Sequence, residues 1–96
     1  MITHVVSFKL KDRSPDNVRK TQQVLLGMKG KIAELLELEV GVDVLHSDRS
    51  YDIVLISKHE SLAGLEGYQV HPVHKEVIAY MKTVVDASVA VDFESE

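Results

Sequence analysis

The chain contains segments in which apolar and polar side chains alternate with the period of two that a β-strand requires. The pattern is found in residues 2–10, 37–45 and 88–94. Residues 51–58 differ, because they carry apolar side chains on both faces, Ile53 and Leu55 on one and Val54 and Ile56 on the other. This is typical of a central strand that is covered on both sides. The sequence therefore predicts four strands in these segments. A polar turn at residues 46–50 separates the second strand from the third.

A first helix is predicted to begin after the first strand. Ser14-Pro15-Asp16 supplies an N-cap hydroxyl, a proline at the first helical position and an acid in the first turn. Apolar residues then recur at helical spacing, namely Val18, Leu25, Met28, Ile32 and Leu35. Gly27 and Gly30 weaken this run, so we expect a kink or a break near Gly30.

A second helical region is predicted to be interrupted by Pro72. Proline lacks an N–H and restricts the residue before it, so a helix from about Ser61 should stop near Val70. A further helix can begin at Pro72, with His71 beside its cap, and continue to about Val84.

The predicted order is β-α-β-β-α-β with the second helix broken, which is the ferredoxin-like α+β pattern of a four-stranded antiparallel sheet with helices on one face. We expect residues 1–96 to form a single domain. The helix-free face still carries Val5 and one face of the third strand. An exposed apolar face usually indicates a partner, so we predict a homodimer formed through the sheets.

Composition narrows the classes of function. The 96 residues are 45% hydrophobic and 27% charged, as in ordinary globular proteins. The absence of cysteine excludes disulfides and thiolate chemistry. A net charge of −4 with scattered positive residues argues against nucleic acid as a partner. No leader pattern or membrane-length apolar run is present, so we expect a cytoplasmic protein without membrane partners. No nucleotide or dinucleotide fingerprint occurs, and no cofactor is expected.

The segment from Tyr68 to His74 is the most chemically distinctive part of the chain. A phenol at the end of one helix and an imidazole in the first turn of the next can converge on one pocket, where both can exchange protons. The alternative is that His74 is half-buried and serves only to satisfy Tyr68. His71 and His74 have the spacing of metal ligands, but Pro72 separates them, so we expect no metal site.

The predicted ligand pocket lies between the helices and the sheet. Mostly apolar walls with a few convergent polar groups are typical of a site for a small apolar or aromatic ligand. Besides Tyr68 and His74 as catalytic residues, the candidate ligand-binding residues are His4, Val6, Phe8, Met28, His71 and Met81. For His4 and His71 a structural role, in a hydrogen bond to a helix and in a helix cap, is the alternative.

Several segments resemble the stress-responsive dimeric α/β-barrel (Dabb) family. They are His4-Val5-Val6-Ser7-Phe8-Lys9-Leu10-Lys11, Glu39-Val40-Gly41-Val42-Asp43, Glu60-Ser61-Leu62, Tyr68-Gln69-Val70-His71-Pro72-Val73-His74 and Val91-Asp92-Phe93-Glu94. The resemblance covers nearly the whole chain, and Tyr-x-x-His-Pro-x-His is its most specific part. It implies a ferredoxin-like subunit that dimerises through its sheet into an eight-stranded α/β barrel.

The family also implies a chemistry. It includes plant stress proteins and a plant polyketide cyclase, in which the tyrosine and last histidine of the motif do acid–base work. These positions correspond to Tyr68 and His74, and His4 matches the first-strand histidine. A further histidine of the cyclase lies on the third strand, where this chain has Ile53.

Two other functions are compatible with the same architecture. One is a non-catalytic stress-response or scaffold protein. The other is a small monooxygenase or haem-degrading protein, which the sequence does not favour because it contains no tryptophan to work beside a histidine.

Overall fold

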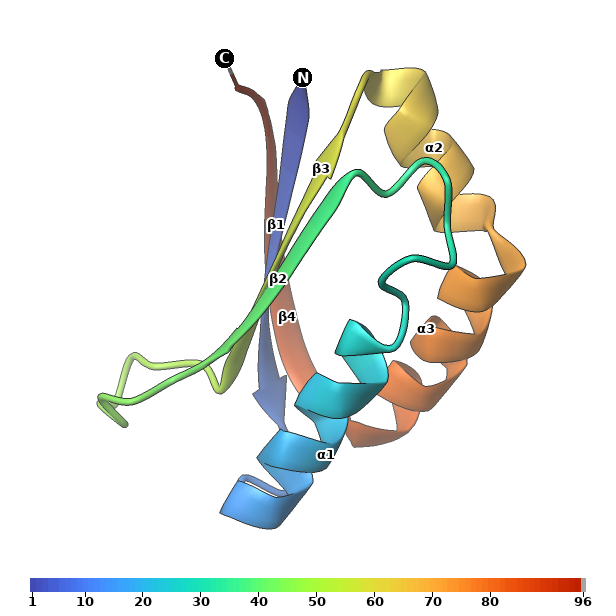
Figure 1. The fold of residues 1–96 in the computed structure, drawn as a ribbon. Helices are drawn as coiled ribbons and strands as arrows, with labels where there is room; N and C mark the ends of the chain where they lie inside the picture. Colours follow the sequence, from blue (N-terminus) through green and yellow to red (C-terminus); the bar gives the residue numbers. More distant parts are fainter. Residues whose placement is uncertain (96) are drawn as a thin grey trace.

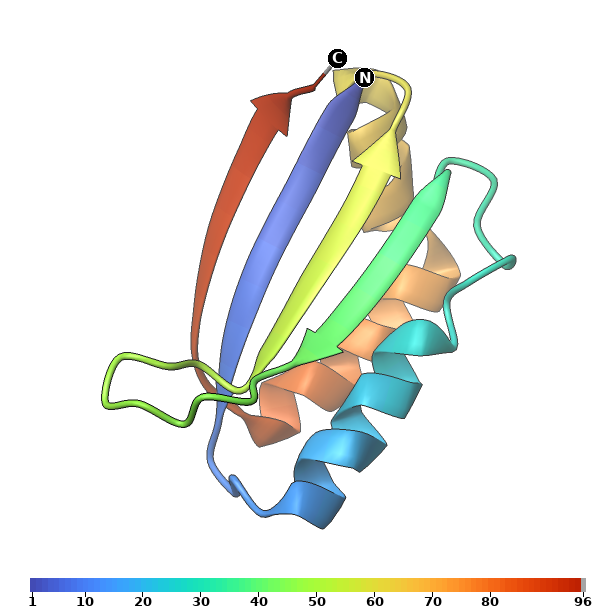
Figure 2. The ribbon, with the colours of Figure 1, turned by 60° about the vertical axis from the view of Figure 1, so that its left-hand side comes forward.

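The computed structural model describes residues 1–95 as one antiparallel sheet with helices on one of its faces (Figures 1 and 2). The elements, in chain order, are β1 (Ile2–Leu10), α1 (Pro15–Leu26), β2 (Glu37–Val42), β3 (Ile53–His59), α2 (Leu62–Val70), α3 (Pro72–Val84) and β4 (Val85–Glu94). The strand order is β2-β3-β1-β4. The predicted ferredoxin-like class is confirmed.

The strand register decides which side chains lie under the helices. His4 of β1 lies opposite Ser57 of β3 and Asp92 of β4, and this set faces the helices. The next residue, Val5, lies opposite Ile56 and Val91 and faces the other way. The two faces follow from the period of two along each strand.

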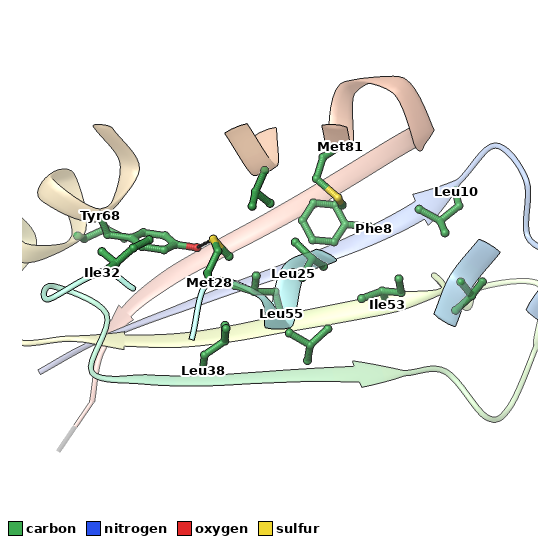
Figure 3. Close-up of a cluster of buried hydrophobic side chains, with 14 of the residues drawn as sticks. Phe8, Leu10, Leu25, Met28, Ile32, Leu38, Ile53, Leu55, Tyr68 and Met81 are labelled. Atoms are coloured by element: carbon green, nitrogen blue, oxygen red, sulfur yellow. Dashed lines mark hydrogen bonds between the residues drawn. The ribbon is translucent and has the colours of Figure 1, made fainter. Parts of the chain in front are cut away.

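The core lies between the sheet and the helices (Figure 3). Its most deeply buried apolar side chains come from strands, helices and the connection after α1, and they are Leu10, Leu25, Met28, Ile32, Ile53, Leu55, Tyr68 and Met81. In Figure 3 the hydroxyl of Tyr68 points toward Met28, and Met81 lies against the ring of Phe8.

The first helix ends earlier than its apolar spacing suggested. It stops at Leu26, and residues 27–36 form turns and irregular chain, so Met28, Ile32 and Leu35 are not helical. Met28 and Ile32 are nevertheless buried. Gly30 lies within the turns after the helix and adopts φ 79°, a left-handed conformation that favours glycine. The predicted break near Gly30 therefore begins at Gly27.

Four strand boundaries also differ from the alternation pattern. β2 ends at Val42 rather than at residue 45, because Asp43 accepts the N–H of His46 (2.7 Å) and turns the chain. β3 runs from Ile53 to His59 rather than over residues 51–58, and β4 begins at Val85 rather than at residue 88, directly after α3. The loop between β2 and β3 projects on the side away from the helices (Figure 1).

The proline break is as predicted. α2 has Ser61 as its N-cap and ends at Val70, and α3 begins at Pro72 with His71 as its N-cap. None of the helices in residues 1–95 has the length and apolar character needed to cross a membrane.

Candidate functional site

A cavity of about 250 Å³ lies between the sheet, α3 and the segment that ends α1. Its walls are mainly apolar, and its polar lining groups are His4, Tyr68, Gln69, His74 and Ser88. A cavity of this kind, with few polar groups on apolar walls, has the character of a small-molecule site.

Tyr68 is brought to this cavity by the last turns of α2 and is only 1% exposed. Its hydroxyl donates to the thioether Sδ of Met28 at 3.9 Å, which is a weak acceptor (Figure 3). Burial raises the pKa of Tyr68 to about 12, because the phenolate would lose its hydration. At neutral pH the phenol therefore keeps its proton and can donate it.

His74 lies in the first turn of α3, and its ring centroid is 4.5 Å from that of Tyr68. Its Nδ1–H donates to the carbonyl of Gln69 (2.9 Å), and since a carbonyl can only accept, Nδ1 carries the proton. Burial lowers the pKa of His74, although the hydrogen bond to Gln69 acts in the opposite direction. The imidazole is thus neutral at neutral pH, with Nε2 as its basic atom.

The free Nε2 of His74 reaches open space. It has no hydrogen-bond partner among residues 1–95, and none of their side-chain nitrogens or oxygens is both buried and unpaired. His74 also lines the cavity, so its imidazole borders the space that a ligand would occupy.

His4 lies beneath Tyr68 on the covered face of β1, with ring centroids 6.3 Å apart. Its Nδ1 donates to the carboxylate of Asp92, its register partner on β4. The carboxylate fixes the ring orientation and the tautomer of His4, whose side chain lines the cavity. The sequence analysis did not identify Asp92, because residues 4 and 92 meet only through the β1–β4 register.

His59 is a second residue that sequence reasoning missed. It ends β3, is fully buried, and its ring centroid is 4.7 Å from that of Tyr68. Nδ1–H donates to the carbonyl of Glu34 (2.8 Å), and Nε2 accepts from Ser57 Oγ (2.9 Å). Burial lowers the pKa of His59, so its ring is neutral, and it packs against the ring of Tyr68. The alternation Ile53, Leu55, Ser57 was the available signal, since His59 continues it.

The other predicted site residues divide clearly. Val6, Phe8, Met28 and Met81 line the cavity with His4, Tyr68 and His74. His71 does not line it, and its Nδ1 instead accepts the N–H of Val73 (3.1 Å) as the cap of α3. For His71 the geometry therefore favours the capping alternative over ligand contact.

Within residues 1–95, no group of three or more acidic or histidine side chains has a geometry that could hold a metal ion. A wider hollow of about 360 Å³ lies between the start of α1 and the end of β2. Its buried Asp52 is already bound by the N–H of Leu10 (2.8 Å) and by Nε of Arg13 (3.0 Å). The carboxylate of Asp52 and the guanidinium of Arg13 therefore already stabilise the structure around this hollow. We place the candidate site at the cluster of His4, Tyr68 and His74 instead.

The fold and the site together define a ferredoxin-like domain with a cavity lined by histidine, tyrosine and apolar side chains. The family described as "Stress responsive A/B Barrel Domain" matches residues 2–95, and the chain belongs to this family. The resemblance seen in the sequence is thereby confirmed. No curated protein matches the chain.

Solved structures with the same fold are described in different functional terms. A dimeric ferredoxin-like protein of unknown function from Thermobifida fusca is 27% identical, with coverage of 98% of this chain and 90% of that one and a TM-score of 0.86. A dimeric protein of unknown function from Bacteroides fragilis is 23% identical, with coverage of 98% and 95% and a TM-score of 0.82. A hydroxynitrile lyase from Passiflora edulis is 16% identical, with coverage of 99% and 93% and a TM-score of 0.84.

Proposed function

We propose that the chain is a single-domain, homodimeric enzyme that moves a proton at a carbon next to a carbonyl group in a small, largely apolar or aromatic ligand. His74 acts as the base and Tyr68 as the hydrogen-bond donor to the carbonyl oxygen. The observation that carries this proposal is the pairing of a neutral imidazole, whose free Nε2 is accessible, with a buried protonated phenol at 4.5 Å between ring centroids.

The proposed step transfers one proton from the ligand to His74. Nε2 of His74 removes a proton from the carbon, and the electron pair of the broken C–H bond moves to the carbonyl oxygen. The Tyr68 hydroxyl, which is held in the site by no acceptor stronger than the Met28 thioether, hydrogen-bonds the resulting enolate. The proton held by His74 then returns to the carbon, which completes an exchange cycle. Alternatively, the enolate carbon bonds to a second carbonyl carbon, whose C=O π bond breaks to give an alkoxide that takes the proton from His74, as in the cyclase chemistry that the family resemblance implies.

A buried hydroxyl with so weak an acceptor supports a functional reading. A thioether gives this buried donor less than the about 1 kcal/mol of an ordinary hydrogen bond, and a phenylalanine would fill the same space without the hydroxyl. The hydroxynitrile lyase in the comparison supports only the point that this fold accommodates enzymes.

Homodimerisation is proposed from the helix-free face. Val91, Val89 and Phe93 are 63%, 55% and 46% exposed there, beside Val5 and Ile56. A second copy of the chain would remove this apolar surface from water. The description of structures from Thermobifida fusca and Bacteroides fragilis as dimeric supports the same assembly.

Hydrogen–deuterium exchange tests the chemistry without knowledge of the natural ligand. The protein is incubated in D₂O with 2-heptanone, and proton NMR follows loss of the signals next to the carbonyl. We expect the parent to accelerate exchange and His74→Gln to lower the rate on the order of a hundredfold. His46→Gln is the matched control, because its side chain is 76% exposed in the β2–β3 loop. Equal rates in all three proteins would favour a non-catalytic scaffold.

A further inference from the structure

The candidate cavity continues into a groove on the surface of the molecule. This groove, of about 510 Å³, runs along α3 and is lined by Gln69, His74, Lys75, Ile78, Ala79 and Lys82. Gln69, His74 and Ile78 line both the groove and the cavity. A ligand whose apolar part occupies the cavity would therefore extend its other end along this groove.

The charged side chains of the groove are both lysines. Lys75 and Lys82 are seven residues apart on one face of α3, which corresponds to a rise of about 10 Å. Neither forms an ion pair within residues 1–95. Glu76 is next to Lys75 in the chain but does not line the groove. The groove is thus locally positive in a chain whose net charge is −4.

The position of Lys75 is informative for a second reason. It lies in the first turn of α3, where the helix dipole favours acidic residues and disfavours a cation. Lys82 lies in the last turn, where a cation is favoured. The helix itself therefore accounts for Lys82 but not for Lys75.

We propose that the ligand of this site is an amphiphilic oxyanion, with its apolar, reacting part in the cavity and its anionic group in the groove beside Lys75 and Lys82. This inference rests on the proposed function and adds the charge of the ligand. Lysine ammonium groups act as point charges, so a carboxylate and a phosphate ester share the required chemistry. The attraction is that of exposed charges and is weakened by salt.

The chain contains its own reporters for this binding event. Of its three methionines, Met28 and Met81 line the cavity, and Met1 does not. Protein labelled with ¹³C at the methionine methyl groups is titrated with 1-octanol, octanoate and octyl phosphate at neutral pH. These probes each contain eight carbon atoms and differ in their head groups. Lys75→Gln combined with Lys82→Gln is compared with the exposed, equally charged control Lys20→Gln combined with Lys31→Gln.

We expect all three probes to shift Met28 and Met81 but not Met1, and the two anions to bind about threefold to tenfold more tightly than the alcohol. The preference should disappear in the groove variant, while 1-octanol binding and the control variant remain unchanged. A preference for octanoate or for octyl phosphate would separate the two anion classes.

Two results would overturn the inference, and they are distinguishable. If 1-octanol binds as tightly as both anions, or if the groove variant keeps the preference, the ligand charge is wrong although the pocket is real. If no probe shifts Met28 or Met81, the pocket of the proposed function fails, and the inference falls with it.

Discussion

Replacement of Tyr68 by phenylalanine separates a chemical role from a structural one. Tyr68→Phe retains the ring that packs on His59 and His74 and removes only the hydroxyl. An ordinary hydrogen bond contributes about 1 kcal/mol net to stability. Here the acceptor is a thioether at 3.9 Å, so the lost bond is weaker, and the relief of a poorly satisfied buried hydroxyl offsets it.

We therefore expect the free energy of unfolding of Tyr68→Phe to lie within about 1 kcal/mol of the parent value, in either direction. For a domain of this size such a change moves the melting temperature by no more than about 4–8 °C. Exchange into 2-heptanone, in contrast, should fall on the order of a hundredfold, because the enolate loses its hydrogen-bond donor.

Urea unfolding and the exchange assay are run on the same samples, with Tyr80→Phe as the matched control. Tyr80 packs against the core from α3 and does not line the cavity. An unfolding free energy lowered by several kcal/mol with unchanged exchange would falsify the chemical role and show that the hydroxyl holds the fold together.

Three further outcomes are expected. The pKa values of His59 and His74 are lowered in the folded state, so the unfolded chain binds more protons below the ordinary histidine pKa of 6.5, and stability falls as pH decreases. Urea unfolding midpoints measured between neutral and mildly acidic pH should show this loss of stability. The loss should be smaller in His59→Gln, which lacks one of the two histidines. Ile56→Asp places a charge on the helix-free face of the sheet and should give monomers in sedimentation. A dimer that persists in this variant would show that the interface lies on another surface. Asp92→Asn should preserve the melting temperature but lower the rate of hydrogen–deuterium exchange, by no more than roughly a hundredfold, because His4 is no longer held by a carboxylate. An unchanged exchange rate would limit Asp92 to a structural role.

The sequence by itself determined the order of the strands and helices, and it singled out Tyr68 and His74 as a candidate pair. Alternation of apolar residues predicted the strands and their covered face, and with it the burial of His4. The break at Pro72 placed Tyr68 and His74 on consecutive helices, and the structure shows their rings in contact. These features are local, because they depend on side-chain period and on the missing N–H of proline. The single-domain expectation for residues 1–96 and the cytoplasmic location stay predictions.

Only the tertiary structure decided the partners that surround Tyr68. Asp92 reaches His4 across 88 positions of sequence through the β1–β4 register, and Glu34 offers its carbonyl to His59 from an irregular segment that no periodicity describes. Helical spacing continued past Leu26, yet the turns at residues 27–31 bury Met28 and bring its sulfur to the phenol. Hydrogen-bond partners across a sheet depend on register and loop path, which are set by packing of the whole chain rather than by the neighbours of each residue.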